Sequence, residues 1–272
     1  MFYTGIVLYN PDMNRLKDNI KSIINQVNYI ICVDNNSKNI DEITSVFKQN
    51  NRIILIKNNS NMGIAYALNQ IVEWGYENNF KWVLLLDQDS IPPKNIIIEY
   101  SKYISMNNIG IISPVIKDIN LSNSNKPLSS YTIINNCQNV ITSGCLVNIQ
   151  VCKLIGTFNE KLFIDFVDIE FNKRMLINGY KIIRVNNVKL IHEVGHIHKY
   201  GLFICTNHNA FRRYYMVRNR LYFKYKYCGQ VDFIISYIRL ILGTCKILIF
   251  EQDKISKLKA TIGGFKDYKK LL

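Results

Sequence analysis

The sequence is short of acidic residues. Of its 272 residues, 20 are Asp or Glu and 34 are Lys or Arg, which leaves a formal net charge of +14 at pH 7. Such an excess favours an anionic partner, namely nucleotide phosphates, a membrane surface or nucleic acid, although a basic surface that serves only solubility has the same composition. Hydrophobic residues make up 48% and charged residues 20%, which excludes a disordered or collagen-like chain.

Several other signals are missing. The seven cysteines are odd in number and form no C-x-x-C pair, so reduced core thiols in a cytoplasmic protein are expected rather than a disulfide scaffold. The first ten residues have neither the basic stretch nor the cleavage site of a signal peptide. No uncharged run reaches the roughly 18 residues of a membrane-spanning helix. Internal repeats and low-complexity linkers are not found either.

The first ninety residues alternate between apolar runs and amphipathic stretches. Strands are predicted at residues 3–9, 29–33, 52–56 and 81–86. Apolar strands separated by helices indicate an α/β fold with a mostly parallel sheet that helices cover on both faces. Ligands of such sheets bind beyond the carboxyl ends of the strands. Polar residues stand at three of these ends: Tyr9–Asn10, Asp34–Ser37 and Asp87–Asp89.

The middle of the chain is more mixed. A strand is predicted at residues 139–147, where it carries Thr142-Ser143-Gly144, and further strands at 181–185 and 188–191. Asp168 is expected to cap a helix that ends near Asn178, because Gly179 follows as a stop signal. From Cys205 onward the chain is predicted to be helical, aromatic and basic.

The strongest chemical signal is the pair of carboxylates in Asp87-Gln88-Asp89. Two oxygen ligands at a fixed strand end suit Mg2+ or Mn2+, which in turn binds a diphosphate. The structural alternative is a helix cap, since Asp89 and Ser90 precede two prolines. Two acids with one residue between them are a weak motif alone, and their position after the fourth strand strengthens it.

Two further clusters lie in the same half. Asp34 could accept a hydrogen bond from the imide N–H of a pyrimidine base, with Asn36 beside it to contact the base or ribose. Asn61 and Gly63 precede a helix whose N-terminus favours a phosphate, and Asn69 lies on that helix. Each cluster taken alone is also explained by a turn.

Taken in order, these motifs resemble the inverting family-2 glycosyltransferases with the GT-A fold. The resemblance covers roughly residues 1–220. It continues beyond the first ninety residues through Thr142 to Gly144, Gly156 to Glu160 and Phe163 to Phe171. The Asp-Gln-Asp form, the Val-Asp-Ile-Glu-Phe form and the later Tyr214 to Asn219 are most similar to bacterial rhamnosyltransferases.

The resemblance implies a role for each matching residue. It assigns Asp34 to the nucleotide base, Asp87 to the ribose or the metal, and Asp89 to a Mg2+ or Mn2+ ion on the diphosphate. His192 would contact the metal or a phosphate. The other donor contacts would come from Tyr9, Asn10, Asn36, Asn61, Gly63, Asn69, Gln88 and Arg218. The acceptor contacts would come from Ser143, Gly144, Asp165 and Glu170.

Asp168 matches the second acid of the family's Glu-Asp pair, whose acid is the general base. Val167 replaces the first acid, so Asp165 and Glu170 remain alternative bases. Asp168 is preferred because its register in the motif matches and because it caps the predicted helix. In this chemistry a carboxylate takes the proton of the acceptor hydroxyl while nucleoside diphosphate leaves from the opposite face, which inverts the anomeric centre.

His192 to His196 also match the H-E-x-x-H motif of zinc proteases. That motif needs a helix, because only a helix places both imidazoles on one face. Here it follows the predicted strand 188–191, and Gly195 weakens a helix. A metalloprotease is therefore not expected.

The C-terminal part is basic, aromatic and apolar. Residues 211–220 are predicted to form a helix whose Arg213 or Arg218 reaches the donor diphosphate. Binding of single-stranded nucleic acid and a solvated amphipathic helix are the alternatives. Residues 231–250 carry a narrow polar stripe on an apolar helix, followed by a lysine-rich tail. An anionic membrane surface and a packing contact, within the chain or in a homodimer, explain this segment equally well.

We therefore predict a catalytic domain over residues 1–204, split at about residue 90 into a nucleotide-sugar half and an acceptor half, and a helical extension over 205–272. The expected reaction moves a sugar from a nucleotide sugar to a lipid-linked or glycan acceptor of a bacterial surface polysaccharide, at the inner face of the cell membrane. The resemblance favours dTDP-rhamnose as donor, with a UDP-sugar as the alternative.

The alternative functions for the whole chain are a metal-dependent nucleotidyltransferase and a nucleic-acid-binding module. A nucleotidyltransferase normally needs a glycine-rich, basic loop after the first strand, and residues 9–12 do not form one. A nucleic-acid-binding module is not supported by any RNA-binding fold signature.

Overall fold

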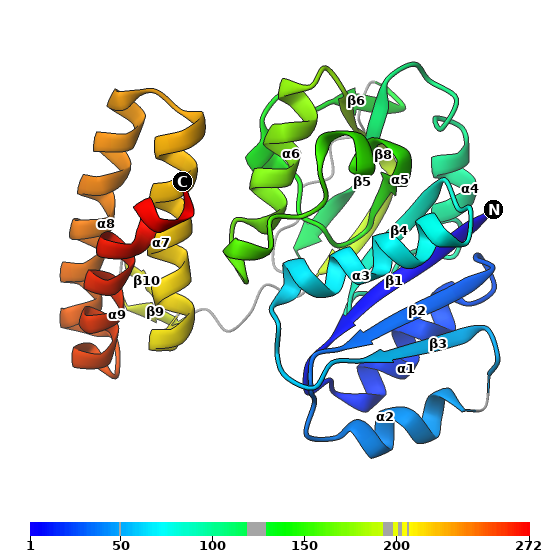
Figure 1. Cartoon of the computed structure of the whole chain (residues 1–272), viewed down its shortest axis with the longest axis horizontal. Helices are drawn as coiled ribbons and strands as arrows, with labels where there is room; N and C mark the ends of the chain where they lie inside the picture. The colour runs from blue at the N-terminus through cyan, green and yellow to red at the C-terminus, as the bar shows by residue number, and fades with distance from the viewer. Residues whose placement is uncertain (49, 119–128, 193–197, 201–202, 206) are drawn as a thin grey trace.

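The computed structural model describes residues 1–48, 50–118, 129–192, 198–200, 203–205 and 207–272. An eight-stranded sheet in the order β3-β2-β1-β4-β7-β5-β8-β6 lies at its centre, and a group of C-terminal helices stands beside it (Figure 1). A separate hairpin consists of β9 (His198–Tyr200) and β10 (Phe203–Cys205). The predicted polar loop at residues 120–130 lies almost entirely outside the described residues.

The first half of the chain confirms the predicted alternation of strand and helix. The parallel strands are β1 (Phe2–Leu8), β2 (Tyr29–Asp34), β3 (Ile53–Lys57) and β4 (Trp82–Asp87). The helices between them are α1 (Met13–Ile23), α2 (Ile40–Phe47) and α3 (Ile64–Glu77). Asp12 caps α1, because its carboxylate accepts hydrogen bonds from the N–H groups of Asn14 and Arg15.

Apolar side chains cover both faces of this sheet. Successive residues of a strand point to opposite faces, so Ile31 and Val33 join one buried cluster with α3 while Ile30 and Cys32 join another with α1. Both clusters continue across the whole sheet. The fully apolar strands in the sequence are explained by this double burial.

The second half adds two strands that run against the others, β7 (Cys145–Asn148) and β6 (Tyr131–Ile133). Its parallel strands are β5 (Ile109–Asp118) and β8 (Lys181–His192). Its helices are α4 (Ile96–Ser101), α5 (Ile149–Ile155) and α6 (Val167–Ile177), with 3-10 turns at Cys137–Asn139 and Glu160–Leu162. Six of the eight strands thus share one direction, and the predicted mostly parallel α/β fold is confirmed.

Three predicted boundaries in this half are wrong. The strand predicted at 139–147 begins only at Cys145, because Gly144 has φ +80°, which breaks the extended backbone before it. The strands predicted at 181–185 and 188–191 are one strand, β8, whose register shifts between Val185 and Lys189. Helix α6 begins at Val167 with Phe166 as its N-cap, so Asp168 lies inside the first turn rather than at the cap.

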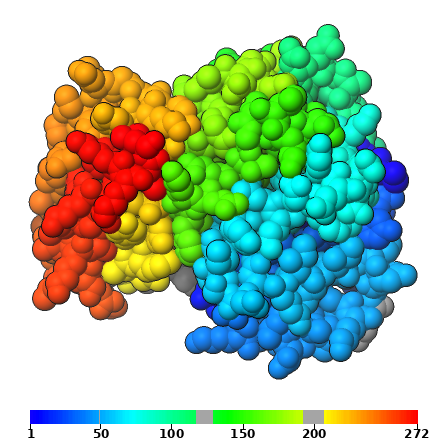
Figure 2. All heavy atoms as spheres, viewed as in Figure 1, coloured from blue at the N-terminus to red at the C-terminus, as the bar shows by residue number. Residues whose placement is uncertain are grey.

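The C-terminal helices are α7 (Ala210–Tyr227), α8 (Gln230–Phe250) and α9 (Lys254–Asp267), and a 3-10 turn ends the chain at Tyr268–Leu271. They form a lobe of their own next to the central sheet and its helices (Figure 2). The backbones of α7 and α9 approach closely, since a Cβ at Gly264 would lie 2.8 Å from that of Val217. Removal of α8 and α9 would therefore expose a packed face of α7.

Candidate active site

The carboxyl ends of β1, β2 and β4 meet as predicted. Leu8 pairs with Asp34 on one side, and Val7 pairs with Asp87 on the other. The loops that follow these strands are linked by hydrogen bonds of two polar side chains, Gln88 and Asn10. The amide of Gln88 exchanges two hydrogen bonds with the backbone of Tyr9, at 2.9 and 3.4 Å. The side chain of Gln88 thus fixes this corner, while the ring of Tyr9 is exposed.

Asn10 joins the same corner to the end of β2. Its N–H donates to the hydroxyl of Ser37 (2.8 Å), and its Oδ1 accepts from the N–H of Lys38 (2.8 Å). It adopts a left-handed conformation with φ 47°, which asparagine tolerates better than most residues. Asn36 is left-handed as well, with φ 67°, and is exposed at the tip of its turn.

The carboxylate of Asp34 is only half satisfied. Its Oδ2 accepts from the N–H of Ser37 at 2.9 Å, whereas its Oδ1 is buried with no hydrogen-bond partner among the described residues. The residue is 1% exposed. A buried acceptor without a donor costs about 1–3 kcal/mol. Ligand N–H groups that displace the atoms covering this oxygen would recover that energy.

The N-terminus of α3 reaches the same edge of the sheet. Gly63 is its N-cap with φ +86°, and a Cβ there would lie 2.7 Å from the carbonyl oxygen of Phe163. Asn61 accepts from the N–H of Gly63 at 3.0 Å, so its side chain shapes the turn. Asn69 lies further along α3, where its amide contacts the backbone of Phe158 and the carboxylate of Glu160.

The turn after β4 leaves the carboxylate of Asp89 exposed. Helix α4 starts only at Ile96, so the alternative in which Asp89 caps a helix is wrong. Ser143 holds this turn through two hydrogen bonds. Its hydroxyl accepts from the N–H of Asp87 at 3.0 Å and shares a hydrogen bond of 2.8 Å with the hydroxyl of Ser90. Gly144 donates from its N–H to Leu85. Both Ser143 and Gly144 are buried and contact the site through this turn.

The chemistry of these residues fits a divalent cation. Mg2+ is usually bound by one or two carboxylates together with substrate phosphates, and Asp87 and Asp89 offer such a pair at a strand end. His192 ends β8, and the residue before it, Ile191, bridges Ile91 of the segment after the turn. The described part of the chain holds no group of three His, Cys, Asp or Glu side chains close enough to bind a metal by itself.

The three carboxylates considered as bases have different surroundings. Asp165 forms a two-point ion pair with Arg212, at 3.0 and 3.1 Å. Glu170 is buried, pairs with Arg174 at 3.0 Å and accepts a hydrogen bond of 2.6 Å from the hydroxyl of Tyr227. Each of these two acids is therefore neutralised by an arginine.

Asp168 has no arginine or lysine partner among the described ion pairs, and its Oδ1 accepts only from the N–H of Ile169, at 2.8 Å. Burial raises the pKa of Asp168 to about 6, in opposition to hydrogen bonds from backbone N–H groups, and the carboxylates of Asp87 and Asp165 add to the rise. The pKa of Asp168 thus responds to the carboxylate at the end of β4. A carboxyl group with a pKa near neutrality is suited to accept a proton.

The loop before Asp168 has an unusual backbone. Phe163, Asp165 and Phe166 have φ values of 65°, 63° and 65°, in the left-handed region that bulky residues rarely adopt. Helix α7 holds this loop. The side-chain amide of Asn219, which is 0% exposed, donates to the carbonyls of Leu162, Ile164 and Asp165.

Arg218 reinforces that contact. Its guanidinium donates to the carbonyl of Lys161 at 2.6 Å and lies over the rings of Tyr214 and Tyr215. The side chain predicted to reach the donor diphosphate thus anchors α7 to the loop. The other arginine proposed for that role, Arg213, is buried between α8 and α9, where it contacts two threonines.

A family model named glycosyl transferase family 2 matches residues 4–163, which is more than half of the chain. The chain belongs to glycosyl transferase family 2. It is 28% identical to the dTDP-rhamnosyl transferase RfbF of Shigella flexneri over 295 residues, which cover 97% of this chain and 95% of that protein.

Solved structures support the GT-A-like fold of this glycosyltransferase. TarS of S. aureus in complex with UDP-GlcNAc has a TM-score of 0.62 at 12% identity and covers 99% of this chain and 81% of its own. GalNAc-T7 with UDP, GalNAc and Mn2+ has a TM-score of 0.63 at 12% identity and covers 99% of this chain and 56% of its own. The fold and the family inferred from the motifs are confirmed.

The sequence indicates which residues cluster at the strand ends but not the contacts between them. Ser37 and Ser90 complete the strand-end turns, and Asn35, which follows β2, donates to the carbonyl of Gly63. The role of Asn219 is not predicted, because in the sequence it is only the end of a basic aromatic stretch. Its carbonyl partners lie more than fifty residues earlier in the chain.

Glu170→Gln should separate a structural role from a catalytic one. The substitution removes the buried carboxylate that pairs with the partly buried Arg174, so we expect a loss of about 3 kcal/mol in the free energy of unfolding. The matched control is Glu73→Gln, which breaks the exposed pair with Lys153 and should cost less than about 0.5 kcal/mol. Chemical denaturation checks both values. If the folded Glu170→Gln enzyme lost transfer activity without loss of stability, Glu170 would be the base instead.

Proposed function

We propose that this glycosyltransferase moves rhamnose from dTDP-rhamnose to a hydroxyl group of a glycan acceptor, with inversion at the anomeric carbon. The relative that is 28% identical over nearly the full length is a dTDP-rhamnosyl transferase, which supports the donor. The observation that carries the mechanism is Asp168. Of the three candidate carboxylates, Asp168 alone has no arginine partner among the described ion pairs, and its pKa is raised to about 6.

The donor base would lie at the end of β2. The thymine of dTDP and the uracil of UDP both carry an imide N–H, and the unpartnered Oδ1 of Asp34 is an acceptor for it. The exposed Asn36 and the ring of Tyr9 border this position. Asp87 and Asp89 would hold a divalent cation on the diphosphate, and that cation would neutralise charge on the leaving group.

The reaction needs one proton transfer from the protein's side. Asp168 takes the proton of the acceptor hydroxyl as the oxygen forms its bond to the anomeric carbon. The bond from that carbon to the diphosphate oxygen breaks on the opposite face, and the nucleoside diphosphate leaves with the electron pair. In this scheme Asp165 and Arg212 border the acceptor side of Asp168, and α7 keeps the loop in place.

The donor site is tested by binding without turnover. We expect dTDP-rhamnose to raise the unfolding temperature, and Mg2+ or Mn2+ to enlarge the shift. Asp89→Ala should abolish the part that depends on the metal, because it removes an exposed ligand without touching the core. Asp34→Ala should weaken dTDP binding about tenfold with or without metal. Differential scanning fluorimetry with UDP-sugars as comparison checks this. If metal enlarged the shift in unfolding temperature equally in Asp89→Ala and in the wild type, the proposed metal site would be contradicted.

Asp168→Asn should abolish transfer yet stabilise the fold. The pKa of Asp168 is raised in the folded state, so its ionisation favours unfolding as the pH rises from about 4 through 6. Asparagine removes that penalty, and we expect a gain of about 2 kcal/mol at pH 7.5 and no gain at pH 4. Transfer should fall at least a hundredfold. In the wild type, kcat/KM should drop about tenfold per pH unit below pH 6. Unfolding curves of the variant and the wild type at pH 4 and pH 7.5 measure the effect on stability. The pH profile of kcat/KM measures the effect on transfer.

We also propose that α8 lies on an anionic membrane surface. Of the polar stripe predicted on this helix, Ser236 is buried against the neighbouring helices, whereas Asp232 and Arg239 are exposed. Thr244, which lies outside that stripe, is buried as well. The exposed large apolar side chains occupy one face instead: Val231, Ile234, Ile235, Ile238, Ile241, Leu242 and Ile249. Within the described chain, α8 is the one helix long and apolar enough to cross a membrane by length and composition, and 22% of its most apolar window is buried.

Exposed lysines of α9 and the final turn follow α8 in the chain, and anionic headgroups would attract them: Lys254, Lys259, Lys266, Lys269 and Lys270. We therefore propose residues 1–204 as the catalytic domain, with α7 as the helix that holds the loop before Asp168 in place. The extension beyond it would bring the enzyme to a lipid-linked acceptor at the inner face of the cell membrane.

Exchange of Ile234, Ile238 and Leu242 for Ser should abolish binding to anionic liposomes and leave transfer to a soluble acceptor intact. The matched control exchanges Leu154, which is exposed on α5. High salt should release the wild type only in part, because salt screens the lysines and not the apolar face. Liposome sedimentation and light scattering measure the outcome. If the wild type ignores liposomes and the triple variant loses a dimer, the face is an interface between copies.

A further inference from the structure

The turn after β4 is held by hydrogen bonds to the backbone of Asp87. The carbonyl of Asp87 accepts from the N–H of Ser90 at 3.2 Å, which closes the turn, and its N–H donates to the hydroxyl of Ser143 at 3.0 Å. The same carbonyl accepts a second and shorter hydrogen bond, 2.7 Å, from the side-chain amide of Asn19. Asn19 lies on α1, 68 residues earlier in the chain. The N–H and the carbonyl of Asp87 are thus both held by residues outside β4.

Asn19 is an exception on its own helix. The other buried residues of α1 are apolar, namely Met13, Leu16, Ile20 and Ile23, whereas Asn19 is an amide that is 0% exposed. Its spacing from Leu16 and Ile23 is that of an apolar stripe, and burial of an amide is costly unless its polar atoms are bonded. The side-chain oxygen of Asn19 is buried with no hydrogen-bond partner among the described residues. The bond to Asp87 is therefore the feature that accounts for an asparagine at this position.

The rest of the turn is fixed on either side of Asp89. Ser90 is 0% exposed and shares a hydrogen bond of 2.8 Å with the hydroxyl of Ser143, while the side chain of Gln88 bonds the backbone of Tyr9. The carboxylate of Asp89 is exposed between them. A ligand whose backbone is already in place loses less conformational freedom when it binds. Groups that hold metal ligands typically change metal affinity about ten- to hundredfold.

We propose that Asn19 and Ser143 are positioning residues for the divalent cation on the donor diphosphate. Their hydrogen bonds to the backbone of Asp87 keep the two acids of the turn in place for that cation. The inference rests on the proposed function, because the cation is part of it. In this role each side chain acts through the backbone of Asp87. Asn19 breaks the apolar pattern of its helix, as residues at functional positions often do.

Asn19→Leu tests this role, because leucine completes the apolar stripe of α1 and removes the donor to Asp87. Isothermal titration calorimetry with dTDP, without metal and at one subsaturating Mn2+ concentration, gives the gain in dTDP affinity that Mn2+ causes. We expect the variant to reduce this gain about tenfold and to bind dTDP without metal as the wild type does. In urea the ligand-free variant should unfold at the same concentration as the wild type or at a higher one, since the unpartnered oxygen is gone.

Thr4→Val is the matched control. The hydroxyl of Thr4 on β1 is also buried without a hydrogen-bond partner among the described residues, and valine has nearly the same shape. This variant should unfold at the same urea concentration as the wild type or at a higher one. Its affinity for dTDP should be unchanged both with and without Mn2+, because Thr4 does not bond the turn.

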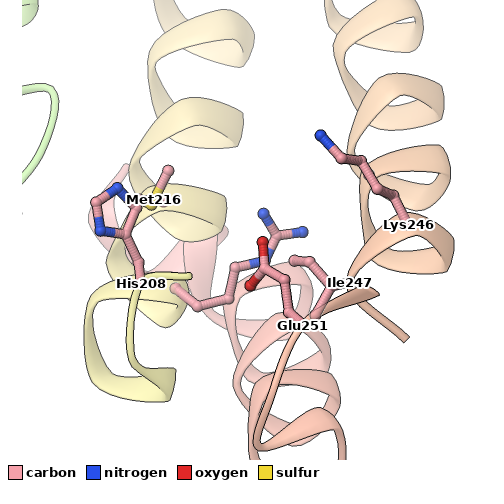
Figure 3. Close-up of a pocket in the computed structure, with 7 residues that line it drawn as sticks. His208, Met216, Lys246, Ile247 and Glu251 are labelled. Atoms are coloured by element: carbon pink, nitrogen blue, oxygen red, sulfur yellow. The ribbon is translucent and has the colours of Figure 1, made fainter. Parts of the chain in front are cut away.

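A second control separates stability from metal binding. Figure 3 shows a cavity in the C-terminal lobe, with lining residues that include His208, Met216, Lys246, Ile247 and Glu251. Ile247 is 7% exposed. Ile247→Val removes one buried methylene group there, so it should lower the urea concentration of unfolding. It should leave the gain in dTDP affinity from Mn2+ unchanged.

Ser143→Ala provides an independent variant, because it removes the acceptor of the Asp87 N–H. It should also reduce the effect of Mn2+, and it decides the question if Asn19→Leu fails to fold. If the variants keep the full effect of Mn2+, the positioning role is wrong while the metal site stands. An equal loss of dTDP affinity with and without metal would also overturn the role, since it would show general damage to the donor site. If Mn2+ has no effect on dTDP binding in the wild type, the proposed metal site is refuted, and the positioning role with it.

Discussion

The catalytic loop depends on one buried amide. Asn219 donates to three carbonyls between Leu162 and Asp165, where the chain adopts left-handed conformations at residues whose side chains oppose them. Such a backbone costs on the order of 1–3 kcal/mol per residue and persists only where its surroundings determine it. The ring of Phe163, stacked on Tyr215 at 5.0 Å, and the ion pair of Asp165 with Arg212 supply the rest of that support. Helix α7 therefore fixes the conformation of the loop that carries Asp165 and leads to Asp168.

The distribution of charge follows from this arrangement. Arginines neutralise Asp165 and Glu170, whereas no arginine or lysine pairs with the carboxylate of Asp168 in the part of the chain that the structure describes. Among these three acids, Asp168 alone bears the energetic cost of a carboxylate without a cation beside it in the described structure. Such a cost is typical of functional positions, because a carboxylate that is stabilised by a cation is a weaker base.

The sequence predicted those features that depend on neighbours along the chain. Apolar runs gave the strands of the first half, and their polar ends converged because parallel strands end at one edge. The cap of α1 is of this local kind, since Asp12 accepts from N–H groups only two and three residues away. The contacts of Arg218 with the carbonyls of Lys161 and Leu162 were not predicted, because these partners are distant in sequence and a basic aromatic helix carries no mark of what it contacts.

Helix α8 illustrates the limit of a periodic pattern. Its polar and apolar stripes were both visible in the sequence, but the pattern does not determine which stripe meets the protein. In the structure the buried polar residues Ser236 and Thr244 face the lobe, where Thr244 contacts Arg213, and the apolar stripe is exposed. A soluble monomer would gain from burial of that stripe, since burial of apolar surface stabilises a fold by about 25 cal/mol per Å². The exposed orientation of the apolar stripe is consistent with the proposed contact between this helix and lipid.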